Sequence, residues 1–272
     1  MDIKDIIVDS IKYPLSDPKK FFIFAIILLF TSIGGYAPLF NATQDQIRIL
    51  VIIGFLVGFL VNGYFFRVLK YALDDLVGLP DFNNWKVMFT DGVKVFLVEI
   101  IYLLPAILLT IFAIFSSAEY LALTGTDVDA LLLALTQSKI LEMILYLIGT
   151  FTLVPFFLYG ILYLLIITPL FLVAVGIMAN YDGEFRAAFD IREIFEDMAG
   201  IGWGKLILWY VITGVIFLIL FIVFINVLYY ILSLILLEGM LLDTVLGIFV
   251  FLINPYAYLF LARSLALIYI SE

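Results

Sequence analysis

The sequence has 272 residues, of which 65% are hydrophobic and 14% are charged, against about 45–50% and about 25% in a soluble domain. A chain of this length cannot hide so much apolar surface from water, which excludes a soluble globule. The formal net charge of −9 argues against a nucleic-acid partner, because phosphates require a basic surface. Histidine and cysteine are absent, which excludes disulfides, thiolate metal sites and histidine-based catalysis. We therefore predict a membrane protein that is not an enzyme and has no cofactor or metal site.

Six apolar segments are each long enough to cross about 30 Å of hydrocarbon. In chain order they are Phe21–Phe40, Ile49–Tyr71, Val93–Phe115, Leu153–Ala179, Lys205–Tyr229 and Thr244–Ala266. The stretch before the first segment lacks the basic region and cleavage site of a signal peptide, so this segment is expected to remain. Basic residues collect on the side of the two termini, with only Arg48 and Lys139 on the other side. The positive-inside rule therefore predicts a multi-pass protein of the cell membrane with both termini in the cytoplasm.

Three lysines mark the starts of the odd-numbered predicted spans. The segments Asp17-Pro-Lys-Lys20, Asp91-Gly-Val-Lys94 and Gly202-Trp-Gly-Lys205 align without gaps, and an amphipathic segment precedes each. Such segments are typical of helices that lie in the membrane interface. The even-numbered spans share a second pattern, with Asn62-Gly-Tyr64 before Arg67 and Asn254-Pro-Tyr256 before Arg263. We therefore predict an all-α polytopic membrane protein with about six transmembrane helices, in three repeats of amphipathic interfacial helix plus helical hairpin.

These repeats predict a single transmembrane domain over residues 1–272, with approximate units 1–75, 76–182 and 183–272. The second unit is expected to carry an outer-side insertion over about 116–152. Residues 143–181 are uncharged and contain Pro155 and Pro169, so they could form one long kinked span or a two-span hairpin. The fifth span is followed by further apolar residues that overshoot the hydrocarbon, and a break is expected near Asn226.

Polar residues within the predicted spans are the candidates for a functional site. Glu99 is an acidic residue in the third span, with Arg67 and then Arg263 as its expected partners. An inward-facing ion pair that fixes helix packing is the favoured interpretation; an ion, proton or substrate path and snorkelling to the interface are the alternatives. The amides of Asn62, Asn226 and Asn254 are expected to hydrogen bond between helices.

Aromatic residues near the predicted interface are candidate anchors. Phe82 and Trp85 lie in a segment that begins with helix-start residues, and Trp203 lies just before the fifth span. Aromatic side chains of this kind favour the level of the lipid headgroups. In the second span, Gly54 and Gly58 form a glycine–three–glycine pair that permits close contact between helices.

The run Gly63-Tyr-Phe-Phe-Arg67, followed by Leu79-Pro-Asp-Phe-Asn-Asn-Trp85 and Asp91-Gly-Val-Lys94, resembles a family of archaeal multi-pass membrane proteins catalogued as domain of unknown function 4013. The later Phe185-Arg-Ala-Ala-Phe189, Ile201-Gly-Trp-Gly-Lys205 and Ala262-Arg263 are similar to further blocks of that family. The resemblance implies a prokaryotic cell-membrane protein and supports the predicted architecture. It implies no catalytic or binding residues.

Two functional hypotheses follow from the placement of the polar residues. The favoured one is a membrane-embedded structural or interaction protein, whose cytoplasmic interfacial helices contact the lipid bilayer, a protein partner or a second copy of the chain. The alternative is a transporter of a small solute, ion or lipid that uses Glu99 and Arg67. A cavity near the middle of the membrane, lined by the polar residues named above, would favour the transporter.

Overall fold

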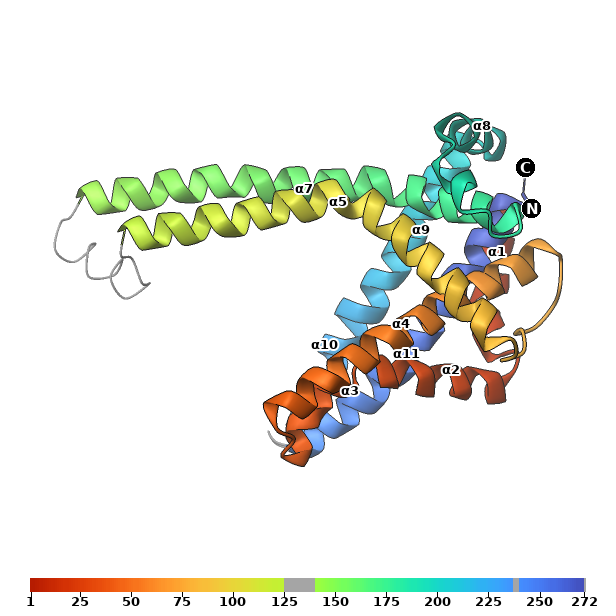
Figure 1. Cartoon of the computed structure of the whole chain (residues 1–272), viewed down its shortest axis with the longest axis horizontal. Coiled ribbons are helices and arrows are strands. Elements are labelled where there is room, and N and C mark those ends of the chain that lie inside the picture. Colours follow the sequence, from red (N-terminus) through yellow and green to blue (C-terminus); the bar gives the residue numbers. More distant parts are fainter. Residues whose placement is uncertain (125–139, 237–239, 272) are drawn as a thin grey trace. The chain divides into compact units, whose positions relative to one another are not determined.

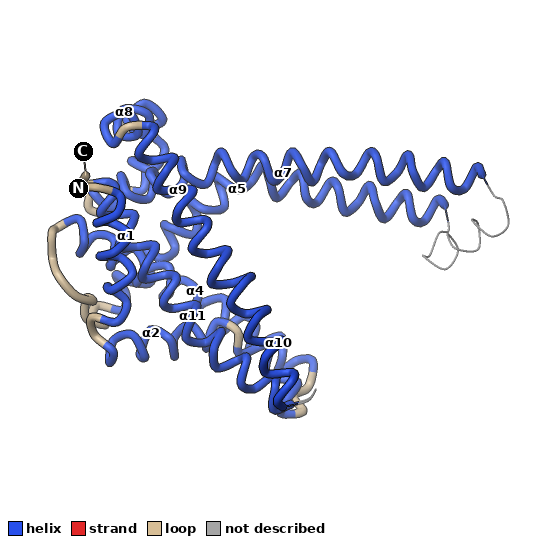
Figure 2. The backbone as a smooth tube through the Cα atoms, turned by 180° about the vertical axis from the view of Figure 1, so that it is seen from behind, coloured by secondary structure: helices blue, strands red, loops and turns tan. Residues whose placement is uncertain are grey.

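Helices account for almost all of the described chain (Figure 2). The computed structural model describes residues 1–124, 140–236 and 240–271, and no strand is present over these residues. Long uncharged runs can satisfy their backbone groups in lipid only as helices. Contacts divide the chain into two compact units. Unit 1 comprises Met1–Val98 and Leu172–Glu272, and unit 2 comprises Glu99–Phe171.

Five helical stretches among the described residues are long and apolar enough to cross a membrane. They lie within α4 (Gln44–Leu73), α5 (Trp85–Thr124), α7 (Ile140–Asn180), the continuous run of α9 (Trp203–Leu218), η4 (Ile219–Phe224) and α10 (Ile225–Leu236), and α11 (Met240–Tyr269). They correspond to the second to sixth predicted spans. The prediction of an all-α polytopic membrane protein is confirmed.

The first predicted span, Phe21–Phe40, is divided among three short helices. They are α2 (Pro18–Thr31), α3 (Ile33–Tyr36) and η2 (Ala37–Phe40). Asp17 caps the start of α2, with Pro18 in its first turn. Ser32 ends α2 in a non-helical conformation, and the glycine pair and proline that follow are poor helix formers. At 14 residues, α2 is about 21 Å long, which is short of the hydrocarbon thickness, so the first predicted span and the total of six stay predictions.

Two short amphipathic helices lie outside the long ones. Helix α1 (Ile3–Lys12) is capped by Asp2 and continues into η1 (Tyr13–Leu15). Helix α8 (Ile191–Ile201) follows η3 (Phe185–Phe189), is capped by Asp190 and ends at Gly202, whose φ of 91° is readily available only to glycine. Each buries one side, with Ile6 in α1 and Ile194 and Met198 in α8. They correspond to two of the predicted interfacial segments.

The core of unit 1 lies where α4 packs beside α11 and α2 (Figure 1). Fully buried aromatic side chains fill it, among them Phe24, Tyr64 and Phe260. The backbones of α4 and α5 touch at two glycines. A Cβ on Gly63 would lie 1.7 Å from the carbonyl oxygen of Met88, and a Cβ on Gly92 would lie 1.7 Å from that of Phe59. No side chain fits at either position.

The break expected near Asn226 takes the form of a π-helical turn. The π-helix covers Ile219–Phe224, and the α-helix resumes at Ile225. The Asn226 side chain donates from Nδ2 to the carbonyl of Ile222 at 2.6 Å. The acceptor belongs to the same helix, and among the described residues no bond from Asn226 to another helix, as we predicted, is found. The helix is widened here rather than ended.

Unit 2 consists of the later part of α5 and the earlier part of α7. The hydroxyl of Tyr163 in α7 donates to the carbonyl of Tyr102 in α5 at 2.7 Å. Residues 143–180 belong to the single helix α7, which decides between the two readings of that stretch in favour of one long helix. The predicted insertion, 116–152, is helical over residues 116–124 and 140–152. Its remainder lies outside the described residues.

Candidate functional site

The loop between α4 and α5 is held by side chains from four other parts of unit 1. Tyr13 Oη donates to the carbonyl of Gly78 at 2.8 Å, and Lys20 Nζ donates to that of Leu79 at 2.6 Å. Tyr64 Oη donates to the carbonyl of Pro80 at 3.0 Å. We call the five donors that hold this loop, residues 74–84, the loop clamp: Tyr13, Lys20, Tyr64, Arg67 and Arg263.

Arg67 makes the largest share of these bonds. Its Nη1 donates to the carbonyls of Asp81 at 2.9 Å and Asn83 at 2.7 Å, and to the side-chain oxygen of Asn83 at 3.1 Å. Its Nη2 donates to the carbonyl of Asn84 at 3.5 Å. A planar guanidinium can serve several acceptors on one side, whereas a lysine ammonium cannot present the same fork. Arg67 therefore fixes the segment that leads into α5.

Arg263 holds the other end of the loop. Its Nε donates to Asp9 at 2.8 Å, and its Nη1 lies 3.4 Å from the carbonyl of Leu76. The guanidinium also stands 5.1 Å from the centre of the Tyr13 ring, within the range of a cation–π contact. Burial raises the pKa of Tyr13 above its ordinary range, and the nearby charge of Arg263 opposes this. Tyr13 therefore stays a neutral donor at any physiological pH.

Aromatic rings of the loop and of the neighbouring helices pack against one another. The rings of Tyr64 and Phe82 stack at 4.1 Å between centroids, and Trp85 follows Phe82 at 6.0 Å. Phe24 of α2 meets the other side of Tyr64 at 4.9 Å. Tyr64 is completely buried, so its hydroxyl requires the carbonyl of Pro80 as a partner.

The three lysines at the starts of the odd-numbered spans make equivalent contacts. Lys20 donates to the carbonyl of Leu79, Lys94 to that of Gly183 at 2.8 Å, and Lys205 to that of Ser271 at 2.6 Å. Each acceptor lies shortly after the end of a long helix: α4, α7 and α11 respectively. The N-terminal parts of α2, α5 and α9 and the segments that follow α4, α7 and α11 therefore meet at one end of unit 1, which we call the clamp face. Both termini lie there (Figure 1).

Ion pairs accompany these backbone contacts at the clamp face. Lys20 Nζ lies 2.8 Å from a carboxylate oxygen of Asp81 and 3.6 Å from Asp17. The hydrogen bond from Lys20 lowers the pKa of Asp81, and the charge of Lys20 acts in the same direction. Lys70 pairs with Asp182 at 3.0 Å and links the end of α4 to the turn after α7. These ion pairs join side chains of the loop and of the turn after α7 to α2 and α4.

A family model described as "Protein of unknown function (DUF4013)" matches residues 47–229, about two thirds of the chain. The chain belongs to the DUF4013 family. The match includes Tyr64, Arg67, the held loop and two of the three equivalent lysines, Lys94 and Lys205. No curated protein and no solved structure matches the chain. The predicted resemblance is thus confirmed, and the clamp gives a physical role to the motif that carried it.

Two predicted site residues of this DUF4013 protein, Arg67 and Arg263, act on the same loop. Glu99 belongs to unit 2, and no hydrogen bond or ion pair of its carboxylate is found among the described residues. Its pairing with Arg67 stays a prediction. The amide of Asn62 likewise has no hydrogen bond within the described part of the chain. Of the predicted anchors, Phe82 is stacked within the clamp, while Trp85 and Trp203 are about half exposed.

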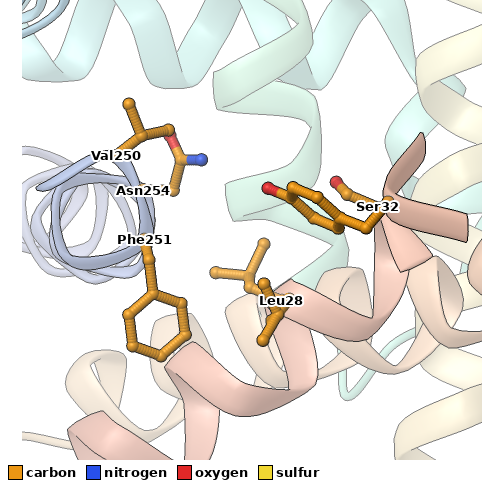
Figure 3. A pocket seen from close by; sticks show the side chains of 7 residues that line it. Leu28, Ser32, Val250, Phe251 and Asn254 are labelled. Atoms are coloured by element: carbon orange, nitrogen blue, oxygen red, sulfur yellow. The ribbon is translucent and has the colours of Figure 1, made fainter. Parts of the chain in front are cut away.

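Asn254 lines a small cavity between α2 and α11 (Figure 3). Val250, Phe251 and Asn254 of α11 form one side, and Leu28 and Ser32 form the other. Its volume is about 40 Å³, where roughly 10–15 Å³ suffices for one water molecule. Pro255 lacks the N–H that would bond to the carbonyl of Phe251. The cavity therefore suits a few water molecules and is too small for an organic solute.

Sequence reasoning missed Tyr13 and the glycine pair Gly63 and Gly92. Tyr13 belongs to no motif, and its role depends on a loop 65 residues away. Gly63 stood in the family motif, but nothing in the sequence paired it with Gly92. The predicted glycine pair is half correct: a Cβ on Gly54 would lie 2.4 Å from the carbonyl oxygen of Thr31, whereas Gly58 faces open space.

Proposed function

We propose that this DUF4013 protein is a membrane-embedded structural protein that holds a rigid surface at the cytoplasmic side for a protein partner. The observation that carries the proposal is the loop clamp, in which side chains hold the carbonyls of residues 76, 78, 79, 80, 81, 83 and 84. So many donors directed at one loop stabilise a fixed shape. A fixed shape is an advantage for binding, because less conformational entropy is lost on association.

The exposed side of the held loop offers apolar contacts. Val77 is 87% exposed and Leu76 is 42% exposed, between Asp75 and Gly78, which have positive φ angles. Exposed aliphatic side chains on a fixed turn favour contact with another surface. The acidic residues Asp74 and Asp75 precede them, so a partner with basic groups around an apolar centre fits this turn best.

Photo-crosslinking in the cells that make the protein tests the proposal. A photoreactive residue at Val77 should give one discrete protein adduct, identified by mass spectrometry, and the same residue at Phe40 should not. Phe40 is also strongly exposed, at 81%, and lies at the opposite end of α4. The adduct should disappear with Arg67→Met. Equal adducts from both positions, or an adduct of Val77 that ignores Arg67→Met, would contradict the proposal; a second copy of the chain in the adduct would make the surface an oligomer contact.

Passage of a small ion is a second candidate, supported by the cavity beside Asn254. Ser32, Tyr36 and Asn254 supply neutral polar groups there, and a broken helix beside a proline-containing one is a common setting for ion sites. Ion flux into sealed vesicles that contain the purified protein tests it. Flux that Asn254→Leu abolishes, and Asn226→Leu does not, would favour transport over the structural proposal.

A further inference from the structure

An apolar groove runs beside the clamp face of unit 1. The start of α2, the π-helical turn and α11 form its walls, and its volume is about 380 Å³. Leu15 and Phe22 lie on one wall, Leu220 and Phe224 on the second, and Ile253 and Tyr256 on the third. The groove depends on the π-helical turn, because Leu220 and Phe224 both belong to Ile219–Phe224. Such turns are rare and are often retained at functional sites.

The groove offers no polar group to an occupant. The one polar side chain in its lining, Tyr256, already donates its hydroxyl to the carbonyl of Ile11 at 2.7 Å. A polar solute in this groove would lose its hydrogen bonds to water and gain none. A hydrocarbon chain has no such hydrogen bonds to lose, and each CH₂ group that it buries against the apolar walls favours binding.

Two lysines lie close in sequence to the residues that line the groove. Lys19 adjoins Pro18 of the lining, Lys12 ends the helix before Leu15, and both are exposed. No ion pair of either lysine is found among the described residues. The acidic side chains nearby are engaged: Asp9 with Arg263, and Asp17 with Lys20. Of the two adjacent lysines, Lys20 serves the clamp, which leaves Lys19 available to an anion.

We propose that this groove is a binding site for an anionic phospholipid, with acyl chain against the apolar walls and phosphate at Lys19 and Lys12. The groove is lined at one end by Leu15 of η1 and by Pro18, the first residue of α2, where the chain enters the apolar region. A phosphate at the level of the headgroups and an acyl chain below it would match this arrangement. The site is independent of the partner proposed for the held loop.

Native mass spectrometry of the full chain tests the proposal. The protein is purified into detergent with equal amounts of phosphatidylglycerol and phosphatidylcholine that carry the same acyl chains. We expect one retained phosphatidylglycerol per chain, with at least a five-fold preference. Lys19→Gln should reduce the preference to below two-fold. Lys86→Gln should leave it unchanged, because Lys86 is an exposed lysine at the start of α5 and is not part of the groove.

A second pair of variants tests the acyl-chain part. Ile253→Trp fills the groove and should abolish retention of both lipids, whereas Ile248→Trp, on an exposed part of the same helix, should not. Equal retention of the two lipids by the original chain, or retention that survives Ile253→Trp, overturns the proposal. A dimer that Ile253→Trp abolishes overturns it too, because the groove then holds a second copy of the chain. Displacement of the lipid by inorganic phosphate at millimolar concentration would also overturn it, because the site would then recognise phosphate alone.

Discussion

Arg67 holds more of the clamped loop than any other side chain. It donates to the carbonyls of Asp81, Asn83 and Asn84, and hydrogen bonds to a charged group contribute about 1.5–3 kcal/mol each. We expect Arg67→Met to lower the free energy of unfolding by about 2–4 kcal/mol, because the released carbonyls are partly hydrated. Arg67→Lys should recover only part of this loss. Denaturant unfolding in mixed micelles measures both.

Arg48→Met is the matched control for this prediction. Arg48 forms an exposed pair with Asp45 at 3.2 Å, and pairs of this kind contribute little. The change should leave the free energy of unfolding within about 0.5 kcal/mol of its original value. Equal effects of Arg67→Met and Arg48→Met would show that the clamp does not stabilise the fold.

Asp81 gives the clamp a dependence on pH. Its pKa is lowered by the hydrogen bond from Lys20. A carboxyl group with a lowered native pKa stabilises the fold above its unfolded pKa, and this contribution is lost as pH falls through the native value. The melting temperature of the original chain should therefore exceed that of Asp81→Asn at about pH 6, and the difference should shrink below about pH 4. A constant difference across this range would exclude the Lys20 contact as its cause.

Arg67 and Arg263 show how far the partners of a charged residue can be predicted from sequence. Both Arg67 and Arg263 were predicted as partners of a carboxylate, since a buried charge requires compensation. Arg263 does pair with a carboxylate, but it is that of Asp9, and Arg67 is compensated by backbone carbonyls. A carbonyl has no signature in the sequence, because every residue carries one. Sequence reasoning therefore finds the donor and not its acceptor.

At the scale of elements, the contact between α4 and α5 depends on two glycines. A Cβ on Gly63 or Gly92 would overlap a carbonyl oxygen of the facing helix. We expect Gly63→Ala and Gly92→Ala each to lower the free energy of unfolding by about 1–3 kcal/mol or more, because the helices must separate. Gly58→Ala lies on the same helix and faces open space. It should be neutral or raise stability by up to about 1 kcal/mol through its helix propensity, and a loss as large as that of Gly63→Ala would contradict this packing.

Lysines in the N-terminal parts of α5 and α9 connect elements that are distant in sequence. Lys94 and Lys205 each donate to a carbonyl just beyond another helix. Lys94→Met and Lys205→Met should each cost about 1–2 kcal/mol, since the carbonyl can regain part of its bonding from water. Lys86→Met, at an exposed lysine of the same face, should cost less than about 0.5 kcal/mol. Equal losses of unfolding free energy in all three variants would show that the two lysine–carbonyl contacts do not stabilise the fold.

Helices were easier to predict than their interruptions. Five of the six predicted spans coincide with long helices, because an uncharged run of about 20 residues has one stable form in lipid. The first span is divided at Ser32, and the fifth carries a π-helical turn. The first irregularity involves a neighbouring helix, because the carbonyl of Thr31, next to Ser32, packs on Gly54 of α4. The local sequence around Ser32 gives no indication of that contact, so the break could not be predicted from it.

At the scale of the whole molecule, the threefold repeat stays a prediction, and the three lysines that were aligned for it make similar contacts. Lys20, Lys94 and Lys205 were aligned from sequence, and each bonds to a carbonyl after a long helix. Their acceptors lie 59, 89 and 66 residues further along the chain. The alignment anticipated equivalent lysines; it could not anticipate their acceptors, because the three following segments share no sequence pattern.

Both proposed binding surfaces depend on which side of the membrane each end of unit 1 occupies. The proposed partner surface and the proposed lipid site both require the clamp face to lie at one membrane surface. The chain has no cysteine, so single cysteines at Val77, Ile191 and Phe40 can be labelled without background by a maleimide that does not cross membranes. Val77 and Ile191 belong to the clamp face, and Phe40 lies at the other end of α4.

Labelling of intact and of opened cells compares these three positions directly. We predict that Val77→Cys and Ile191→Cys react only after the membrane is opened, as expected for the cytoplasmic side, and that Phe40→Cys reacts in intact cells. Reaction of all three from the same side, or of Val77→Cys and Ile191→Cys from opposite sides, would contradict a single clamp face at one membrane surface.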